Sequence, residues 1–260
     1  MDHFPGLRTA VLFVGALAPI LAAQNRPGGE RVPVQTANLT PQELEDQGDT
    51  LRGQKDYLGS IDCYRAAWKK SETPILHNKA GISYSQLHRI REAKREYEQA
   101  IHLDPAYAEP HNNLGALYYS AQRYGPAVKE YQKAIRLTPE NAVFHNNLGA
   151  AYFSEKDFTR AMKEFTRAME LDPTIFERQA SGGSSVKLVS SDQRGHFHYL
   201  MAQMYGSQND LERCRYYLSK ANEEGYPIRD ALHDGEFAGL RKDPEFVAFV
   251  RSLKPPQEEQ

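Results

Sequence analysis

The chain has 260 residues, of which 40% are hydrophobic and 25% are charged, and its formal net charge is -2. This balance excludes the strongly basic surface with which many proteins bind nucleic acid or an anionic membrane. Two cysteines are too few for a disulfide-stapled mini-domain or an array of zinc fingers. Tyrosine is abundant, with 15 residues against a single tryptophan, and this excess needs an explanation.

The N-terminal segment has the features of an export signal. An uncharged run from Thr9 to Ala23 follows Arg8. A basic flank, a short apolar run and small residues at its end are typical of a secretory signal peptide, and the run is shorter than the ~20 apolar residues that cross a bilayer. We therefore expect residues 1–23 to be cleaved, leaving a periplasmic or secreted protein without a membrane span. The alternative is an uncleaved N-terminal segment that anchors the protein to the membrane.

Residues 24–40 are polar and rich in proline and glycine, and we expect them to form a flexible linker. After this linker, the sequence pattern repeats every 34 residues. The segment HNNLGALY begins at His111, and HNNLGAAY begins at His145. Glycines recur at the same phase in four successive copies, namely at Gly48, Gly81, Gly115 and Gly149. Alanine, an aromatic residue, a second alanine and a proline follow the glycine at nearly constant spacing in the clear copies.

This pattern resembles that of the tetratricopeptide repeat (TPR) family over roughly residues 41–173. The resemblance implies an all-α fold, a right-handed α-solenoid of stacked hairpins in which each repeat has a helix A and a helix B. We expect repeats 1–4 over residues 41–175. Seven of the 15 tyrosines are in phase with the repeat, so we predict that these seven pack between helices and do not mark a binding site.

The period breaks after Pro173. Residues 176–194 have a serine- and glycine-rich centre, and we expect a flexible insertion there. A degenerate repeat 5 is predicted over residues 195–228, giving about five repeats in all. We expect residues 229–260 to form C-terminal capping helices and a tail, because a stacked array needs a cap over its last apolar face.

The common catalytic motifs are missing from the sequence. A GxSxG elbow and an HExxH pair are both absent. Four histidines recur at the fourth place of helix A, but equivalent residues of stacked repeats lie too far apart to share one metal ion; they are His77, His111, His145 and His198. We therefore expect these histidines to pack between helices, and we predict a non-enzymatic protein without a metal or a cofactor.

In TPR proteins certain residues of helix A line the concave groove of the solenoid. By this resemblance, the groove here is predicted to include Asn78, Asn112, Asn113, Tyr119, Asn146, Asn147, Phe153 and Tyr199. A side-chain amide carries a donor and an acceptor, as a peptide unit does, so Asn113 and Asn147 are similar to the asparagines that hold the backbone of an extended peptide in some TPRs. The alternative is that the asparagines only solvate an unoccupied face.

We therefore expect a non-catalytic scaffold or adaptor of the cell envelope that binds a protein or an extended peptide through its concave groove, and no nucleic acid. The alternative is an accessory subunit of an envelope enzyme or assembly machine, which would contact that machine through residues 176–194. Some TPRs grip a C-terminal carboxylate with basic side chains, but Glu45 and Asp49 stand at matching places here, so that activity is not expected.

Overall fold

The computed structural model describes residues 38–176, 191–228 and 231–253. Within these ranges the chain forms eleven α-helices and two short 3-10 helices. The predicted signal peptide and most of the predicted linker, insertion and tail lie outside the described residues. None of the described helices is both long and apolar enough to cross a membrane.

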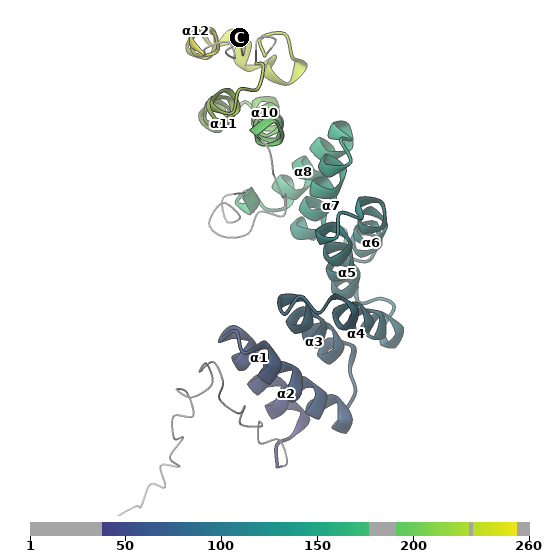
Figure 1. Ribbon diagram of the computed structural model, residues 1–260. Coiled ribbons are helices and arrows are strands. Elements are labelled where there is room, and N and C mark those ends of the chain that lie inside the picture. Colours follow the sequence, from purple (N-terminus) through teal and green to yellow (C-terminus); the bar gives the residue numbers. More distant parts are fainter. Residues whose placement is uncertain (1–37, 177–190, 229–230, 254–260) are drawn as a thin grey trace, which may run out of the picture.

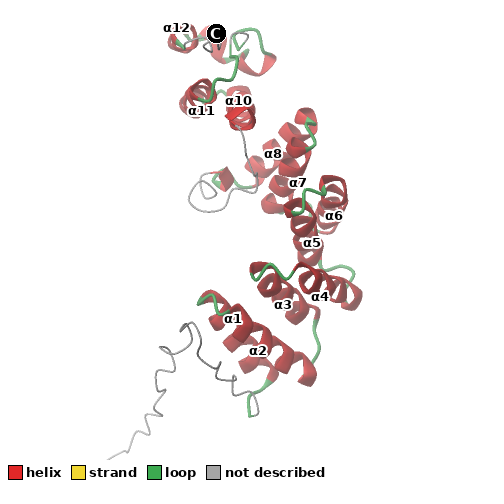
Figure 2. Cartoon of the chain, viewed as in Figure 1, coloured by secondary structure: helices red, strands yellow, loops and turns green. Residues whose placement is uncertain are grey.

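The first ten of these helices pair into five hairpins that follow one another along an arc (Figure 1). The pairs are α1 (Pro41–Gly53) with α2 (Tyr57–Lys70), α3 (Pro74–Gln86) with α4 (Ile90–Leu103), α5 (Ala108–Ser120) with α6 (Tyr124–Leu137), α7 (Ala142–Ser154) with α8 (Phe158–Leu171), and α10 (Ser191–Ser207) with α11 (Leu211–Glu223). Figure 2 shows helices joined by short loops throughout the described part. The predicted all-α fold of stacked helix hairpins is confirmed.

The local sequence explains where the helices begin. Thr40, at the end of the predicted linker, is the N-cap of α1: its Oγ1 accepts a hydrogen bond from the amide of Glu43, and the Glu43 carboxylate accepts one from the amide of Thr40. Thr73 and Asp157 cap α3 and α8 in the same way with their side-chain oxygens. These contacts satisfy amide protons that have no partner within the helix.

A glycine in helix A of each of the first four repeats allows an aromatic ring of helix B to approach. A Cβ atom at Gly48 would lie 2.5 Å from the ring of Tyr64, and one at Gly115 would lie 2.7 Å from the ring of Tyr131. Gly81 with Tyr97 and Gly149 with Phe165 repeat this arrangement. The four rings are almost fully buried, so these phased aromatic residues belong to the framework, as predicted.

The fifth hairpin keeps the register of the repeat but changes its packing residues. Its helix A, α10, begins at Ser191, four residues before the predicted start of repeat 5. Ala202 stands in place of the glycine, and Leu218 stands in place of the aromatic residue; both are fully buried. Because Leu218 has no ring, the Cβ atom of Ala202 can be accommodated where the earlier repeats require glycine.

The C-terminal cap consists of η1 (Gly235–Phe237), η2 (Leu240–Lys242) and α12 (Pro244–Ser252). It therefore contains one short α-helix and two 3-10 helices, at the place where capping helices were expected. Phe237 and Phe246 are fully buried and lie in one hydrophobic cluster with residues of repeats 4 and 5. The cap thus covers apolar surface at the end of the array, which a stack of repeats requires.

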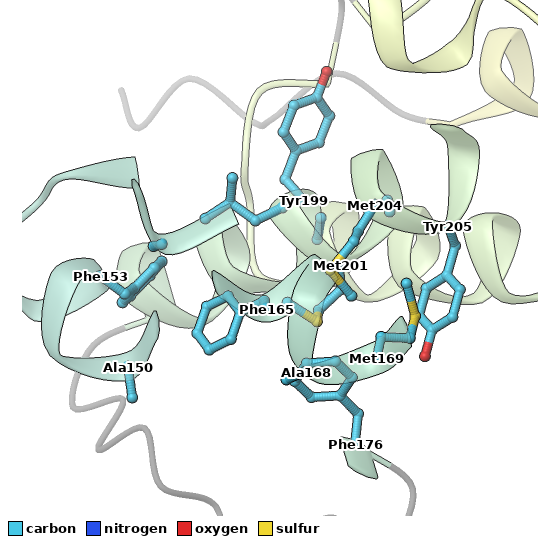
Figure 3. Close-up of a cluster of buried hydrophobic side chains, with 14 of the residues drawn as sticks. Ala150, Phe153, Phe165, Ala168, Met169, Phe176, Tyr199, Met201, Met204 and Tyr205 are labelled. Atoms are coloured by element: carbon cyan, nitrogen blue, oxygen red, sulfur yellow. The ribbon is translucent and has the colours of Figure 1, made fainter. Parts of the chain in front are cut away.

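The junction of repeats 4 and 5 forms the centre of this cluster. The ring of Phe165 in α8 lies 5.7 Å from that of Phe197 in α10 and 5.8 Å from that of Phe176, between ring centroids. Figure 3 shows Phe165, Phe176, Met169 and Met201 gathered in this region. Phe176, the first residue of the predicted insertion, therefore packs in the core, whereas residues 177–190 lie outside the described part of the chain.

Candidate functional site

The candidate site is a row of polar side chains at the fifth and sixth places of the A helices. We call the members that hydrogen-bond between repeats the A-helix row, and they are Glu45, Asn78, Lys79, Asn112, Asn113 and Asn147. Helices α3, α5 and α7 contact one another in succession, so equivalent side chains of neighbouring repeats come within hydrogen-bonding distance. The row therefore arises from the repeat itself, since the A helices of repeats 1–4 present these places to one another.

One hydrogen-bonding rule runs along the row: a sixth-place side chain donates to the fifth-place side chain of the preceding repeat. Lys79 Nζ lies 2.5 Å from Glu45 Oε1. Further along, Asn113 Nδ2 donates to Asn78 Oδ1 at 2.9 Å, and Asn147 Nδ2 donates to Asn112 Oδ1 at 2.8 Å. The polar side chains predicted to line a groove thus tie adjacent repeats together.

The asparagines of the row divide into buried and accessible members. Asn78 and Asn112 are buried, whereas Asn113 and Asn147 remain partly exposed. An asparagine amide can donate two hydrogen bonds, and no described residue accepts the second one from Asn113 or Asn147. The buried members therefore orient the accessible members, and each accessible amide keeps an N–H group that can donate a hydrogen bond to a ligand.

The other predicted groove residues are buried. Asn146 is only 1% exposed. The hydroxyl of Tyr119 lies 3.0 Å from Ser154 Oγ, the ring of Phe153 packs against Phe158, and the hydroxyl of Tyr199 donates to Asp234 in the cap.

The three aromatic rings were expected to provide the apolar part of a groove, but they pack between successive repeats or against the cap. Less than a tenth of each is exposed. The reason is their place in helix A, which faces the following element of the stack. They leave little surface for a ligand.

The accessible apolar surface near the row comes from the second place of helix A. Ile75 in α3 and Val143 in α7 are 46% and 44% exposed. Residues four apart lie on the same face of a helix, so Ile75 stands one turn from Lys79, and Val143 stands one turn from Asn147. The corresponding residue of α5 is the exposed Glu109, so apolar side chains flank the row on the helices before and after it.

A second recurring contact was missed by the sequence analysis, although the packing role of the histidines was expected. The fourth residue of helix A bonds a glutamate of helix B in three repeats. The Nδ1–Oε2 distance is 2.8 Å for His77–Glu96, 2.8 Å for His111–Glu130 and 2.7 Å for His145–Glu164. The signal was present in the sequence, because glutamate follows histidine by 19 residues in each of these repeats.

The His77 pair is electrostatically coupled. Burial disfavours the charged imidazole, but hydrogen bonds to Glu96 and Glu72 outweigh burial and raise the pKa of His77. Burial likewise opposes ionisation of Glu96, but its contacts with His77 and Arg95 outweigh it and lower the pKa of that carboxyl. His77 and Glu96 thus favour the imidazolium–carboxylate form, a buried ion pair that joins α3 to α4.

The two cysteines are buried packing groups. Burial raises the pKa of the Cys214 thiol to about 12, so this side chain is a protonated packing group at neutral pH. Cys63 is also buried, in the first repeat. Over the described ranges, no three histidine, cysteine or acidic side chains are grouped closely enough to hold a metal ion.

Comparison with known proteins gives the family of the repeats. A family model described as "TPR repeat" matches residues 81–122 and 117–156, and one described as "Tetratricopeptide repeat" matches residues 142–175. No curated protein matches the chain.

Several solved structures are similar in fold. The structure of PilF from Pseudomonas aeruginosa has a TM-score of 0.53 at 18% identity, with 81% of this chain and 88% of PilF covered. A crystal structure of MamA has a TM-score of 0.48 at 20% identity, covering 68% of this chain and 93% of MamA. The first TPR of Spaghetti (RPAP3), bound to an HSP90 peptide, has a TM-score of 0.43 at 23% identity, covering 45% of this chain and 94% of that domain. The matched models identify tetratricopeptide repeats at residues 81–175, within the stacked hairpins.

Proposed function

We propose that this protein is a non-catalytic scaffold that binds a protein or an extended peptide along the A-helix row. The observation that carries the proposal is the orientation of Asn113 and Asn147 by the buried amides of Asn78 and Asn112. An amide that is already held in place loses less conformational entropy when it binds a peptide unit.

The spacing of the row suits an extended chain. Packed helices lie about 8–10 Å apart, and an extended peptide advances about 3.3 Å per residue. Asn113 and Asn147 occupy the same place in neighbouring A helices, so roughly three ligand residues would separate the peptide units that they contact. A bound peptide would therefore run along the row and across successive repeats.

The amides alone are too weak for a stable complex. Two hydrogen bonds contribute about 1–3 kcal/mol, whereas a micromolar complex needs about 8 kcal/mol. Ile75 and Val143 supply exposed apolar surface beside the row, and a fully buried aliphatic side chain contributes about 1.5–3 kcal/mol. The ligand we propose therefore carries apolar side chains in addition to its backbone.

A peptide-binding experiment tests the row. A library of random unstructured peptides would be selected against the intact protein, and the bound peptides would be measured by calorimetry against the Asn113→Ala/Asn147→Ala variant. We expect its affinity to fall between about fivefold and a hundredfold, the equivalent of the two lost hydrogen bonds.

The matched control is Asn222→Ala, a partly exposed asparagine of α11 outside the row. This variant should bind as the unchanged protein does. If the double variant also keeps full affinity while its melting temperature shows that it is folded, the A-helix row is not the binding site.

We further propose that this binding takes place in the cell envelope. The support is the pattern of residues 1–23, which has the features of a signal peptide. N-terminal sequencing of the protein recovered from fractionated cells tests this location. A mature chain that begins near Gln24 in the periplasm or medium supports it, and a chain retaining Met1 in the cytosolic fraction rejects it.

A further inference from the structure

Helix α10 carries two histidines that face different neighbours. The ring of His196 lies at the junction with repeat 4, where its centroid is 3.7 Å from that of Phe158 and 5.9 Å from that of Phe153. On its other side, the ring of Tyr226, which follows α11, lies 5.1 Å away. His196 is thus packed among aromatic groups that join repeat 5 to repeat 4.

His198 faces the partner helix within repeat 5. Its ring centroid lies 6.2 Å from that of Tyr217 in α11. Tyr217 stands 19 residues after His198, at the place where repeats 2–4 carry the glutamate that bonds histidine. The Nδ1 atom of His198 is buried and has no hydrogen-bond partner among the described residues.

The charged groups around these rings do not form an equivalent pair. The carboxyl of Asp192, one turn earlier on the same helix, lies near His196, and so does the phenol of Tyr226, which follows α11. The neighbours of His196 on α8 and α7 are the uncharged rings of Phe158 and Phe153.

Charges of both signs lie near His198: Glu223, Glu224 and Lys220 of the α11 region, and Arg194 of α10. The Glu224 carboxylate already bonds the Arg194 guanidinium at 2.9 and 2.7 Å. A carboxylate that is held by arginine is a poor replacement for the missing glutamate partner of His198.

We propose that α10 is a pH-sensitive joint, which holds repeat 5 and the cap on repeat 4 while His196 and His198 are neutral and loosens when they are protonated. A neutral imidazole can remain in an apolar contact, whereas a charged one loses hydration there without gaining a carboxylate partner. Protonation of His196 weakens the packing of α10 on α8, and protonation of His198 weakens its packing on α11.

The direction of the pH effect follows from burial. Burial lowers the pKa of both histidines, outweighing Asp192 near His196 and Glu224 near His198, which favour the charged form. In the packed state, α10 contacts α8 and α11; in the released state, these contacts are lost. The two histidines therefore bind protons more tightly in the released state than in the packed state. The contribution of the two neutral histidines to the stability of the packed state is fully present above the ordinary histidine pKa of about 6.5. It is lost as the pH falls below that value towards the lowered pKa values.

Hydrogen exchange of the full chain, measured at about pH 7.5 and about pH 5.5 and corrected for intrinsic exchange, tests the joint. We expect protection in α10, α11 and α12 to fall at the lower pH relative to α5–α8, by about tenfold for each pKa unit that separates the packed and released states. Equal changes in the two regions would overturn the proposal.

The variant His196→Phe/His198→Phe keeps aromatic side chains but cannot titrate. It should lose most of the extra pH dependence, whereas His102→Gln, which removes an exposed histidine of α4, should retain it. Full pH dependence in the double variant would reject the assignment to these two residues. If that variant does not fold, an NMR titration of the unchanged protein decides the question, because values for both histidines at or above about 6.5 contradict the proposal.

Discussion

Repeats 2–4 and repeat 5 place the same residue at the same position of helix A but surround it differently. His77, His111 and His145 each bond a glutamate of their own helix B, whereas His198 faces Tyr217. His77, with its carboxylate partners, retains its contacts when it is charged. His198 lacks such a partner. The register of a repeat therefore does not determine its chemistry, which depends on one residue of the opposite helix.

The same two regions differ in how helix A approaches helix B. In repeats 1–4 a glycine faces an aromatic ring, whereas in repeat 5 an alanine is accompanied by a leucine. In repeat 5 the helix A residue is larger and the helix B side chain that faces it is smaller, so the two helices still pack as a hairpin. The following three predictions test these two differences, from the largest expected effect to the smallest.

The largest effect is expected for Gly115→Leu. A Cβ atom there would lie 2.7 Å from the ring of Tyr131, so the substitution forces the helices apart and should lower the free energy of unfolding by about 3 kcal/mol. Urea denaturation measures this. The control is Gly53→Leu at the exposed end of α1, where nothing lies within 4 Å of an added Cβ atom. Equal stability of the two variants would contradict the close packing of Gly115.

An intermediate effect is expected for Glu96→Gln, which removes the charged partner of His77. Hydrogen bonds to charged groups contribute about 1.5–3 kcal/mol, and Glu96 is only 4% exposed, so a loss in this range is expected near pH 6. Because the pKa of His77 is raised, its charged imidazole contributes fully to the free energy of unfolding below about pH 6.5. That contribution is lost as the pH rises through the raised pKa.

Urea denaturation at about pH 6 and about pH 8 should therefore show a smaller difference between the unchanged protein and Glu96→Gln at the higher pH. The control is Glu98→Gln, because Glu98 forms an exposed ion pair with Lys94 on the same helix. Such pairs contribute little, so this control should be nearly neutral. A difference that grows with pH would show that His77 and Glu96 do not form an ion pair.

The smallest effect is expected for Tyr217→Glu, which gives His198 the partner found in repeats 2–4. The pKa of His198 should rise, as seen by NMR titration, because the new carboxylate favours the imidazolium. The variant also loses the stacked contact between Tyr217 and Tyr205, at a cost of about 0.5–1.5 kcal/mol. Tyr216→Glu on the neighbouring exposed position is the control. A pKa of His198 that does not move would show that the missing carboxylate is not what distinguishes repeat 5.

Much of the fold was predictable because the repeat pattern is dense. Phased glycines, alanines and aromatic residues predict paired helices, and the caps Thr40 and Thr73 precede proline at the first helical position. The turns between the helices were less predictable. Five residues adopt positive φ there, although lysine and glutamine are not enriched in that conformation; they are Lys55, His88, Gln122, Lys156 and Asn209. Helix packing imposes this backbone conformation where the sequence offers no glycine.

The candidate site was predictable only in part. The asparagines of the A helices were recognised as polar residues of one face, but the pattern does not show which of two adjacent amides is buried. Tyr119 and Phe153 share a helical phase that was expected to reach a groove, and both are buried by the following element. The exposure of such a ring depends on the side chains of the neighbouring repeat, and the residue pattern of one helix carries no information about them.

By itself, the sequence determined the helix hairpins, their order and the 34-residue register, because these depend on local preferences and on contacts repeated in every unit. The tertiary structure decided which amides orient others, which aromatic rings remain accessible and which histidines have a carboxylate partner. These properties arise between helices, where the hydrogen bonds and the burial of one side chain depend on the residues that the adjoining helix places against it.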